Sequence, residues 1–174
     1  SRDEAAHAAN HDSLTGLCNR NYYHTYLTTE VLPAHALVFV LDVDQLKLIN
    51  DTLGHAVGDD VIRAAATVLQ SAFRQSDILA RIGGDEFFAM IPNGSIELAE
   101  TAVQRILAGI DAYNERHRDR IPRFDLSTGY ALAWIDGADW DSIIQAADER
   151  MYRQKARKKG LMPIPSLEGP TAAG

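Results

Sequence analysis

The stretch Ile78-Leu-Ala-Arg-Ile-Gly-Gly-Asp-Glu-Phe-Phe-Ala-Met-Ile91 consists of two short apolar runs joined at a pair of glycines. Each run has the length of a β-strand, and Gly83 and Gly84 tolerate the positive φ that tight hairpin turns need. The stretch therefore predicts a β-hairpin. Asp85 and Glu86 follow the glycines directly, so we expect the tip of the hairpin to carry two carboxylates.

Helical and strand patterns alternate on both sides of this hairpin. Residues 37–43 form an apolar run rich in β-branched side chains, which predicts a strand buried on both faces. From residue 60 onward apolar residues recur at helical spacing, and Asp59 or Asp60 is placed to cap that helix. Further elements are predicted as helices over 19–31, 95–110 and 139–158 and as a strand over 126–134. The order α-β-α-β-β-α-β-α predicts an α/β (α+β) sandwich, with a mixed central sheet flanked by helices.

The composition fits one soluble globular domain, with 174 residues of which 46% are hydrophobic and 24% charged. A net charge of −7 argues against general binding to a nucleic-acid backbone. The longest apolar run, residues 36–41, is too short to span a bilayer. The single cysteine, Cys18, excludes an internal disulfide framework and suits a reducing compartment. We therefore expect a cytoplasmic domain that neither binds nucleic acid nor inserts into a membrane through this segment.

The two ends of the chain differ from the middle. Residues 1–10 are polar and rich in alanine, which is typical of the end of a helix that enters from an upstream signalling region. Residues 161–174 contain three prolines and little apolar mass, which predicts a disordered tail. The functional domain is expected over residues 11–160. Because the chain begins at Ser1 and not at a methionine, we expect it to be a piece of a longer protein.

Three acidic residues stand out as candidates for chemistry. Asp42 lies near the end of the predicted buried strand, and Asp85 and Glu86 lie at the hairpin tip. Carboxylates at the ends of neighbouring strands can converge on Mg²⁺, and two such ions can hold the attacking and leaving oxygens of a phosphoryl transfer. The alternative is that Asp42 caps the residues after it and that Asp85 and Glu86 are only a polar turn. Pattern alone favours this alternative.

The segment from residue 42 to residue 60 is unusually polar for a stretch that follows a core strand. It does not match an EF-hand, because Lys47 stands where the loop requires glycine. It contains no Gly-Lys-Ser/Thr and so is not a P-loop either. Without further information it predicts a loop with a short amphipathic helix that carries Leu46, Ile49 and Leu53 on one side.

The hairpin sequence Arg81-Ile-Gly-Gly-Asp-Glu-Phe87 resembles the signature of the GGDEF family, the bacterial diguanylate cyclases. Five further motifs of that family agree in order and spacing; they are residues 11–20, 42–60, 74–77, 127–131 and 147–155. The resemblance covers roughly residues 11–160. It implies a palm-like domain similar to the class III nucleotide cyclases, and the condensation of two GTP molecules into cyclic di-GMP with release of two pyrophosphates.

The resemblance implies a metal site at the acidic residues. Asp42 and Asp85 would hold two Mg²⁺ or Mn²⁺ ions, with the carbonyl oxygen of Val43 as a further ligand. Glu86 would be a ligand or would lie just behind the ligands. Asp85 is also the residue that the family assigns as base for the ribose 3′-hydroxyl. Because a bound metal lowers the pKa of that hydroxyl, a separate base need not be required.

The resemblance also implies which residues bind GTP. Asn50 and Asp59 would bind guanine, and a carboxylate at Asp59 pairs with N1–H and the exocyclic amine of guanine but not with adenine. Helix capping by Asp59 is an alternative role that is compatible with this one. Residues expected at the phosphates are Lys47, Lys155, Lys159 and the backbone N–H groups of Gln45 and Leu46.

Two departures from the family pattern concern these phosphate residues. Leu46 stands where the family usually has phenylalanine, and Lys159 stands where arginine is frequent. The alternative for the lysines is a solvated helix end.

Arg74 and Asp77 match the RxxD motif of the family's inhibitory site, where cyclic di-GMP bridges domains and stops turnover. The alternative is a surface ion pair of little energetic consequence. The full hypothesis is an active cyclase that works as an antiparallel homodimer, under the control of an upstream sensory domain. Two rivals remain: a module that binds GTP or cyclic di-GMP and regulates a neighbour, and a cyclase of mixed GMP–AMP specificity.

Overall fold

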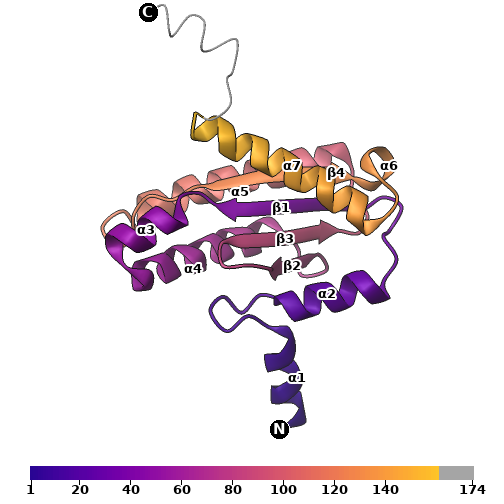
Figure 1. Cartoon of the computed structure of the whole chain (residues 1–174), viewed down its shortest axis with the longest axis horizontal. Coiled ribbons are helices and arrows are strands. Elements are labelled where there is room, and N and C mark those ends of the chain that lie inside the picture. The colour runs from indigo at the N-terminus through magenta and orange to yellow at the C-terminus, as the bar shows by residue number, and fades with distance from the viewer. Residues whose placement is uncertain (161–174) are drawn as a thin grey trace, which may run out of the picture.

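The computed structural model describes residues 1–160 of the chain (Figure 1). The described elements, in chain order, are α1 (Arg2–Asn10), α2 (Arg20–Thr29), β1 (Leu37–Val43), α3 (Leu46–Leu53), α4 (His55–Ala72), β2 (Ile78–Arg81), β3 (Glu86–Ile91), α5 (Ile96–Arg116), β4 (Leu126–Leu132), α6 (Ala133–Asp136) and α7 (Trp140–Lys158). The predicted tail over 161–174 lies outside the described residues.

The four strands form one sheet in the order β2-β3-β1-β4. The β2–β3 hairpin is present with Arg81 opposite Phe87, and the predicted α/β fold class is confirmed. The expectation of a mixed sheet is wrong, since all three neighbouring pairs are antiparallel. The helical connection through α3 and α4 does bring β2 parallel to β1. However, β3 lies between those two strands, so β1 and β2 are not hydrogen-bonded to each other.

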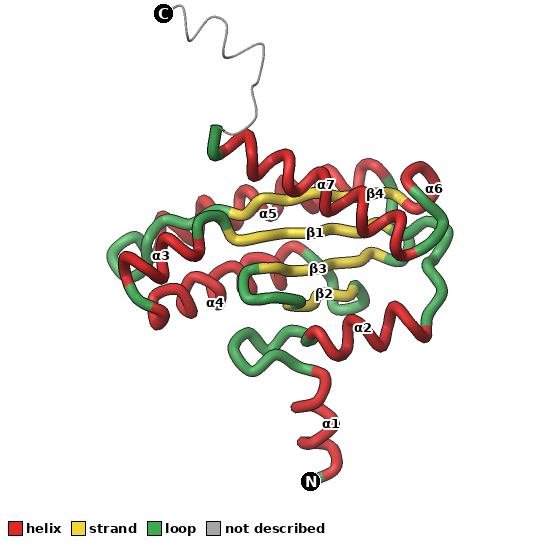
Figure 2. The backbone as a smooth tube through the Cα atoms, in the orientation of Figure 1, coloured by secondary structure: helices red, strands yellow, loops and turns green. Residues whose placement is uncertain are grey.

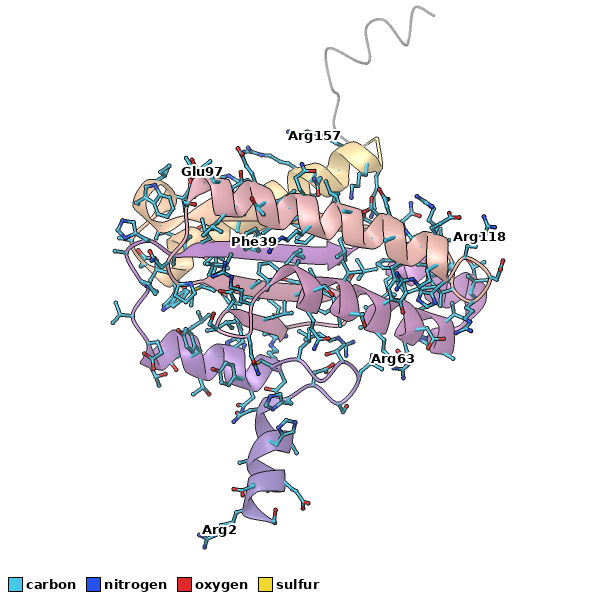
Figure 3. The ribbon with its side chains drawn as sticks, turned by 180° about the vertical axis from the view of Figure 1, so that it is seen from behind. Arg2, Phe39, Arg63, Glu97, Arg118 and Arg157 are labelled. Atoms are coloured by element: carbon cyan, nitrogen blue, oxygen red, sulfur yellow. The ribbon has the colours of Figure 1, made fainter. Side chains whose placement is uncertain are left out.

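Helices cover both faces of the sheet and give a three-layer domain. Helices α4 and α5 lie on one face, and α2 and α7 lie on the other (Figures 1 and 3). Side chains of β1 alternate between the two layers. Phe39 and Leu41 pack with α4 and α5, whereas Val38 and Val40 pack toward α7. All four are buried, which confirms that this strand is buried on both faces.

Helix α7 packs unusually close to β4 at Gly129. A Cβ at this position would overlap backbone atoms of Ala147 and Met151 on the helix. Only glycine permits this approach. The close contact holds α7 against the sheet, so that the last turns of the helix lie beside the end of β1.

Several boundaries differ from the prediction; helix α5, for example, continues to Arg116 and does not end at residue 110. Helix α4 begins at His55 behind Gly54, which has a φ of 94°, so Asp59 and Asp60 lie inside the helix and do not cap it. The first turn of α4 is largely exposed and therefore lacks the apolar pattern that would have revealed it. Strand β4 ends at Leu132, where the short α6 begins. The hairpin turn also differs from the prediction, since neither Gly83 nor Gly84 has a positive φ.

Among residues 1–160, no helix combines the length and the apolar composition needed to cross a bilayer.

Candidate active site

Strand β1 ends and β3 begins at the same end of the sheet (Figure 2), and the pairing of the two strands brings the acidic residues to this end. Asp42, the penultimate residue of β1, lies opposite Glu86, the first residue of β3. The N–H of Val43 donates a hydrogen bond of 2.9 Å to the carbonyl oxygen of Asp85. Directly paired residues of an antiparallel ladder share a face. The sheet therefore brings together the four residues that the resemblance assigns to the metal site.

The Asp42 carboxylate is largely buried and lies beside both a positive and a negative side chain. Its side chain is 15% exposed, and its Oδ2 lies 2.9 Å from the Nζ of Lys155 on α7. Burial raises the pKa of Asp42 to about 7; the hydrogen bond from Lys155 opposes this shift, and the neighbouring Asp85 carboxylate adds to it. The other oxygen, Oδ1, is buried and has no hydrogen-bond partner. A buried carboxylate oxygen without a donor is a position that a cation would stabilise.

The donor set fits a hard divalent cation that shares its ligands with a substrate. Within the described residues, no three Asp, Glu, His or Cys side chains form a ready-made cage for a metal ion. Mg²⁺ is usually held by one or two carboxylates together with substrate phosphates, so a cage is not required. The oxygens available at this place are the orphaned Oδ1 of Asp42, the Asp85 carboxylate and the Val43 carbonyl. The Nζ of Lys155 lies 3.5 Å from that carbonyl oxygen.

Glu86 lies on the side of the sheet covered by α2 and α7. Burial raises the pKa of its carboxyl, and the nearby acidic groups Asp148 and Asp85 raise it further, while Arg20 on α2 lowers it. Glu86 thus has charged neighbours on both α2 and α7. This environment suits a group that lies beside the metal ligands.

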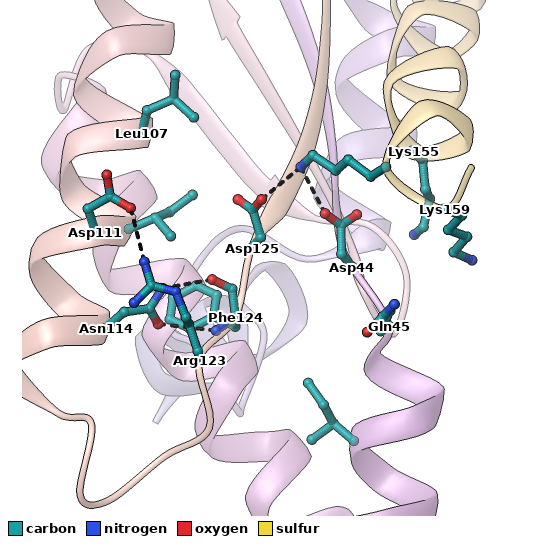
Figure 4. A pocket seen from close by; sticks show the side chains of 13 residues that line it. Asp44, Gln45, Leu107, Asp111, Asn114, Arg123, Phe124, Asp125, Lys155 and Lys159 are labelled. Atoms are coloured by element: carbon teal, nitrogen blue, oxygen red, sulfur yellow. Dashed lines mark hydrogen bonds and ion pairs between the residues drawn. The ribbon is translucent and has the colours of Figure 1, made fainter. Parts of the chain in front are cut away.

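Three of the five residues expected at the phosphates line one pocket of about 470 Å³, whereas Leu46 and Lys47 do not line it (Figure 4). Gln45, Lys155 and Lys159 line it. Gln45 is the N-cap of α3, and Lys47 lies exposed in the first turn of that helix. The first N–H groups of a helix have no intrahelical acceptor and attract anions. Leu46 packs against the core shared with α4 and α5, where the family usually has a phenylalanine.

The same pocket contains charged residues that sequence reasoning missed. Asp44 and Asp125 both form ion pairs with Lys158, at 2.8 and 3.0 Å. The dashed lines to these two carboxylates in Figure 4 mark the ion pairs. The sequence did offer signals, because Asp44 stands two residues after Asp42 and Lys158 lies in a cationic run. The partners are more than thirty residues apart, so the signals could not be paired.

Asn50 and Asp59 lie at the corner between α3 and α4. Gly58 presents its backbone to Asn50, because a Cβ at Gly58 would collide with the Asn50 amide oxygen. The Asn50 side chain therefore lies against Gly58, the residue before Asp59 in the sequence, and the Asp59 side chain is exposed. Neither residue lines the pocket of the phosphate residues. The structure thus places Asn50 and Asp59 at the α3–α4 corner, apart from the pocket that Gln45, Lys155 and Lys159 line.

Comparisons with known proteins agree with this arrangement. The family described as "Diguanylate cyclase, GGDEF domain" matches residues 9–160. This chain belongs to the GGDEF family.

Similar GGDEF proteins include both curated sequences and solved structures. The chain is 32% identical over 167 residues to the probable diguanylate cyclase DgcE of Escherichia coli K12, covering 92% of this chain. It is 34% identical over 149 residues to the diguanylate cyclase DgcP of Pseudomonas aeruginosa, covering 83% of this chain. These matches span only 15% and 22% of the two relatives.

Two solved structures share the fold. The GGDEF domain of TpbB from Pseudomonas aeruginosa superposes with a TM-score of 0.71 at 30% identity, covering 84% of this chain and 89% of that one. The coiled coil and GGDEF domain of DgcB from Caulobacter crescentus, in complex with c-di-GMP, also gives a TM-score of 0.71, at 25% identity, covering 91% of this chain and 85% of that one. The palm-like cyclase fold of the GGDEF domains is therefore the fold of this chain.

The RxxD residues form a second pocket of this GGDEF domain, of about 330 Å³. Arg74 and Asp77 close a turn after α4, in which the Arg74 N–H donates to the Asp77 carboxylate at 2.8 Å. The surface ion pair considered from the sequence is not formed between their side chains in the described structure. Arg105 on α5 lines the same pocket and was not predicted. Two guanidinium groups and one carboxylate thus share a surface hollow.

Residues 12–18, which precede α2, bind to the β2–β3 hairpin through an ion pair and backbone hydrogen bonds. Arg81 pairs with Asp12 at 3.2 Å and donates at 2.8 Å to the carbonyl oxygen of Gly84. Burial alone would raise the pKa of Asp12, but hydrogen bonds donated by the N–H and hydroxyl of Thr15, together with the charge of Arg81, lower it overall. The backbone of Cys18 also pairs with β2: its N–H donates to Leu79 and its carbonyl accepts from Arg81. Residues 12–18 therefore support the loop that carries Asp85.

Proposed function

We propose that this chain is the catalytic domain of a diguanylate cyclase, which condenses two GTP molecules into cyclic di-GMP and releases two pyrophosphates. The observation that carries the proposal is the orphaned Oδ1 of Asp42 beside Asp85 and the Val43 carbonyl. Lys155, which pairs with Asp42, also lines the pocket of the phosphate residues. The family membership and the named relatives support the same activity.

Asp42, Asp85 and the Val43 carbonyl would hold two Mg²⁺ or Mn²⁺ ions, and Glu86 would lie beside them. Bound there, the ions supply charge that lowers the pKa of the ribose 3′-hydroxyl and stabilises the α-phosphate during transfer. Asp85 accepts the 3′-hydroxyl proton if a separate base is used. Lys155, now paired with Asp42, is within reach of the phosphates that would share the site.

The remaining residues bind and orient GTP. The N–H groups of Gln45 and Leu46 at the start of α3 bind the terminal phosphates, together with Lys47 and Lys155. Lys159 lies at the rim of the same pocket and contributes from the end of α7. Asn50 and Asp59 select guanine from the α3–α4 corner. An adenine base would leave the Asp59 carboxylate without its two donors, so we propose GTP over ATP.

One domain holds one GTP, so we propose that two copies meet antiparallel, with each 3′-hydroxyl facing the other copy's α-phosphate. The homodimer, a cytoplasmic location and control by an upstream sensory domain belong to the proposal. Inhibition by the product at Arg74 and Asp77 belongs to it as well. The complex of the DgcB GGDEF domain with c-di-GMP supports a binding site for the product in domains of this fold.

The test is incubation of the chain with GTP and Mg²⁺, both as it stands and fused to a dimerising coiled coil, with nucleotides separated by chromatography. We expect cyclic di-GMP to accumulate and to require Asp85, so Asp85→Ala should abolish product while the circular dichroism stays unchanged. The exposed Asp51 supplies the control variant Asp51→Ala. GTP binding without product in the fused dimer would favour the regulatory module. Incorporation of AMP in competition with ATP would favour the mixed specificity.

A further inference from the structure

On the basis of the proposed function, we propose that Asp44 and Lys158 are positioning residues for the triphosphate. They hold the loop between β1 and α3 in the conformation that presents its backbone N–H groups to the phosphates. Neither residue belongs to the set expected to touch GTP or metal.

The loop is tied to two other parts of the chain through Asp44. One carboxylate oxygen accepts a hydrogen bond of 2.6 Å from the hydroxyl of Ser127 on β4, and the other lies 2.8 Å from Lys158 on α7. The backbone N–H of Asp44 donates at 2.9 Å to the carbonyl oxygen of Asp125. The Asp44 side chain is 14% exposed. Its hydrogen-bonding groups are thus used within the protein.

Lys158 links the C-terminal end of α7 to the loop that carries Asp44 and to the start of β4. Its ammonium group donates to the carboxylates of Asp44 and Asp125 and, at 2.8 Å, to the carbonyl oxygen of Leu126. An ammonium group has three donors, and all three are occupied. Lys158 is therefore not available to a phosphate, although it lines the same pocket as Lys155 and Lys159.

The backbone conformation of Gln45, the residue after Asp44, explains why this loop needs to be held in place. Gln45 has a φ of 57° and is the one non-glycine residue with a positive φ among residues 1–160. A side chain in this left-handed region is strained unless its surroundings hold it there. Gln45 also begins α3 without any side-chain cap. The fixed position of Asp44 is thus what orients the first N–H groups of the helix.

Asp42, near the end of β1, and Asp44, the residue just after β1, each pair with a lysine of α7. Lys155 pairs with Asp42, and Lys158, almost one helical turn later, pairs with Asp44. The first pair lies in the reaction site and the second lies at the base of the phosphate loop. Loss of the Asp44–Lys158 pair should therefore weaken GTP binding without removing any group that takes part in the chemistry.

The experiment compares Asp44→Asn and Lys158→Met with the control Arg157→Met, which removes one exposed charge from the same end of α7. The two test variants should raise the KM for GTP about tenfold, as expected for one charge-assisted hydrogen bond, with kcat nearly unchanged. Amide hydrogen exchange over residues 44–47 should become faster without GTP. Lys158→Arg should restore both quantities in part.

A KM and an exchange rate equal to those of the control would overturn the proposal. A fall of kcat at constant KM would overturn it too, since it would place these residues in the chemical step. If the unchanged chain makes no cyclic di-GMP, the proposed cyclase function fails. In that case the hydrogen-exchange comparison still tests whether Asp44 and Lys158 hold the loop. Faster exchange over residues 44–47 in the variants would support this role, and equal exchange would contradict it.

Discussion

At the scale of single residues, the site depends on one lysine that neutralises a buried carboxylate. Lys155 is 16% exposed and pairs with Asp42. We expect Lys155→Met to lower kcat/KM for GTP by about ten- to a hundredfold, because a charge-assisted contact to the phosphates is lost. Steady-state kinetics measure this effect, with Arg157→Met as the control. Equal kcat/KM in the two variants would show that Lys155 only pairs with Asp42.

The raised pKa of Asp42 predicts a pH dependence of stability in the metal-free chain. The pKa is 3.8 in the unfolded chain and about 7 in the folded one. Between these values the folded state binds more protons, so the free energy of unfolding should fall as the pH rises from about 4 to about 7. Urea unfolding with a chelator present measures this slope.

Asp42→Asn should flatten the slope, whereas Asp51→Asn, at an exposed position, should keep it. Parallel curves for Asp42→Asn and the unchanged chain would contradict the assignment of the proton to Asp42.

The residue-level site was predictable where it depended on strand ends. Asp42, Val43, Asp85 and Glu86 meet because a strand and a hairpin end at the same edge of one sheet, and both ends were visible in the sequence. Arg105 was not predictable in this way. It joins Arg74 and Asp77 through the packing of α5, and its own neighbourhood in the sequence is an ordinary helix surface.

At the scale of elements, the position of α7 against β4 decides whether Lys155 reaches Asp42. We expect Gly129→Ala to lower the free energy of unfolding by about 1–3 kcal/mol, because the added methyl group overlaps the backbone of α7. Thermal unfolding measures the loss. The matched control is Gly84→Ala, since a Cβ at Gly84 meets nothing within 4 Å. Equal losses in the two variants would mean that α7 adapts without strain.

The elements themselves were largely predictable, and the errors have physical causes. Strand β1 and the hairpin were visible because buried strands are uniformly apolar. The start of α4 was missed because its first turn projects into solvent and is capped by Gly54. The antiparallel sheet was missed because the place of β3 between β1 and β2 depends on long-range pairing, which no local pattern records.

At the scale of the whole molecule, the pocket of Arg74, Asp77 and Arg105 involves α5 and the turn after α4. Its residues do not overlap with those of the phosphate pocket. We expect Arg74→Ala and Arg105→Ala to delay the plateau of product formation while the initial rate stays unchanged. Time courses at saturating GTP measure this, with the exposed Arg118→Ala as control. An unchanged plateau in both variants would argue against product inhibition at this pocket.

Strand β2 is an outer strand of the sheet, and the peptide around Cys18 covers part of its edge. An uncovered edge presents free N–H and C=O groups to any other chain. A protein shortened to begin at residue 20 would lose the cover over Leu79 and Arg81. Such a protein should aggregate through edge-to-edge pairing. Low solubility or activity of such a protein would then result from the exposed edge of β2. It should not be interpreted as the loss of a signalling input.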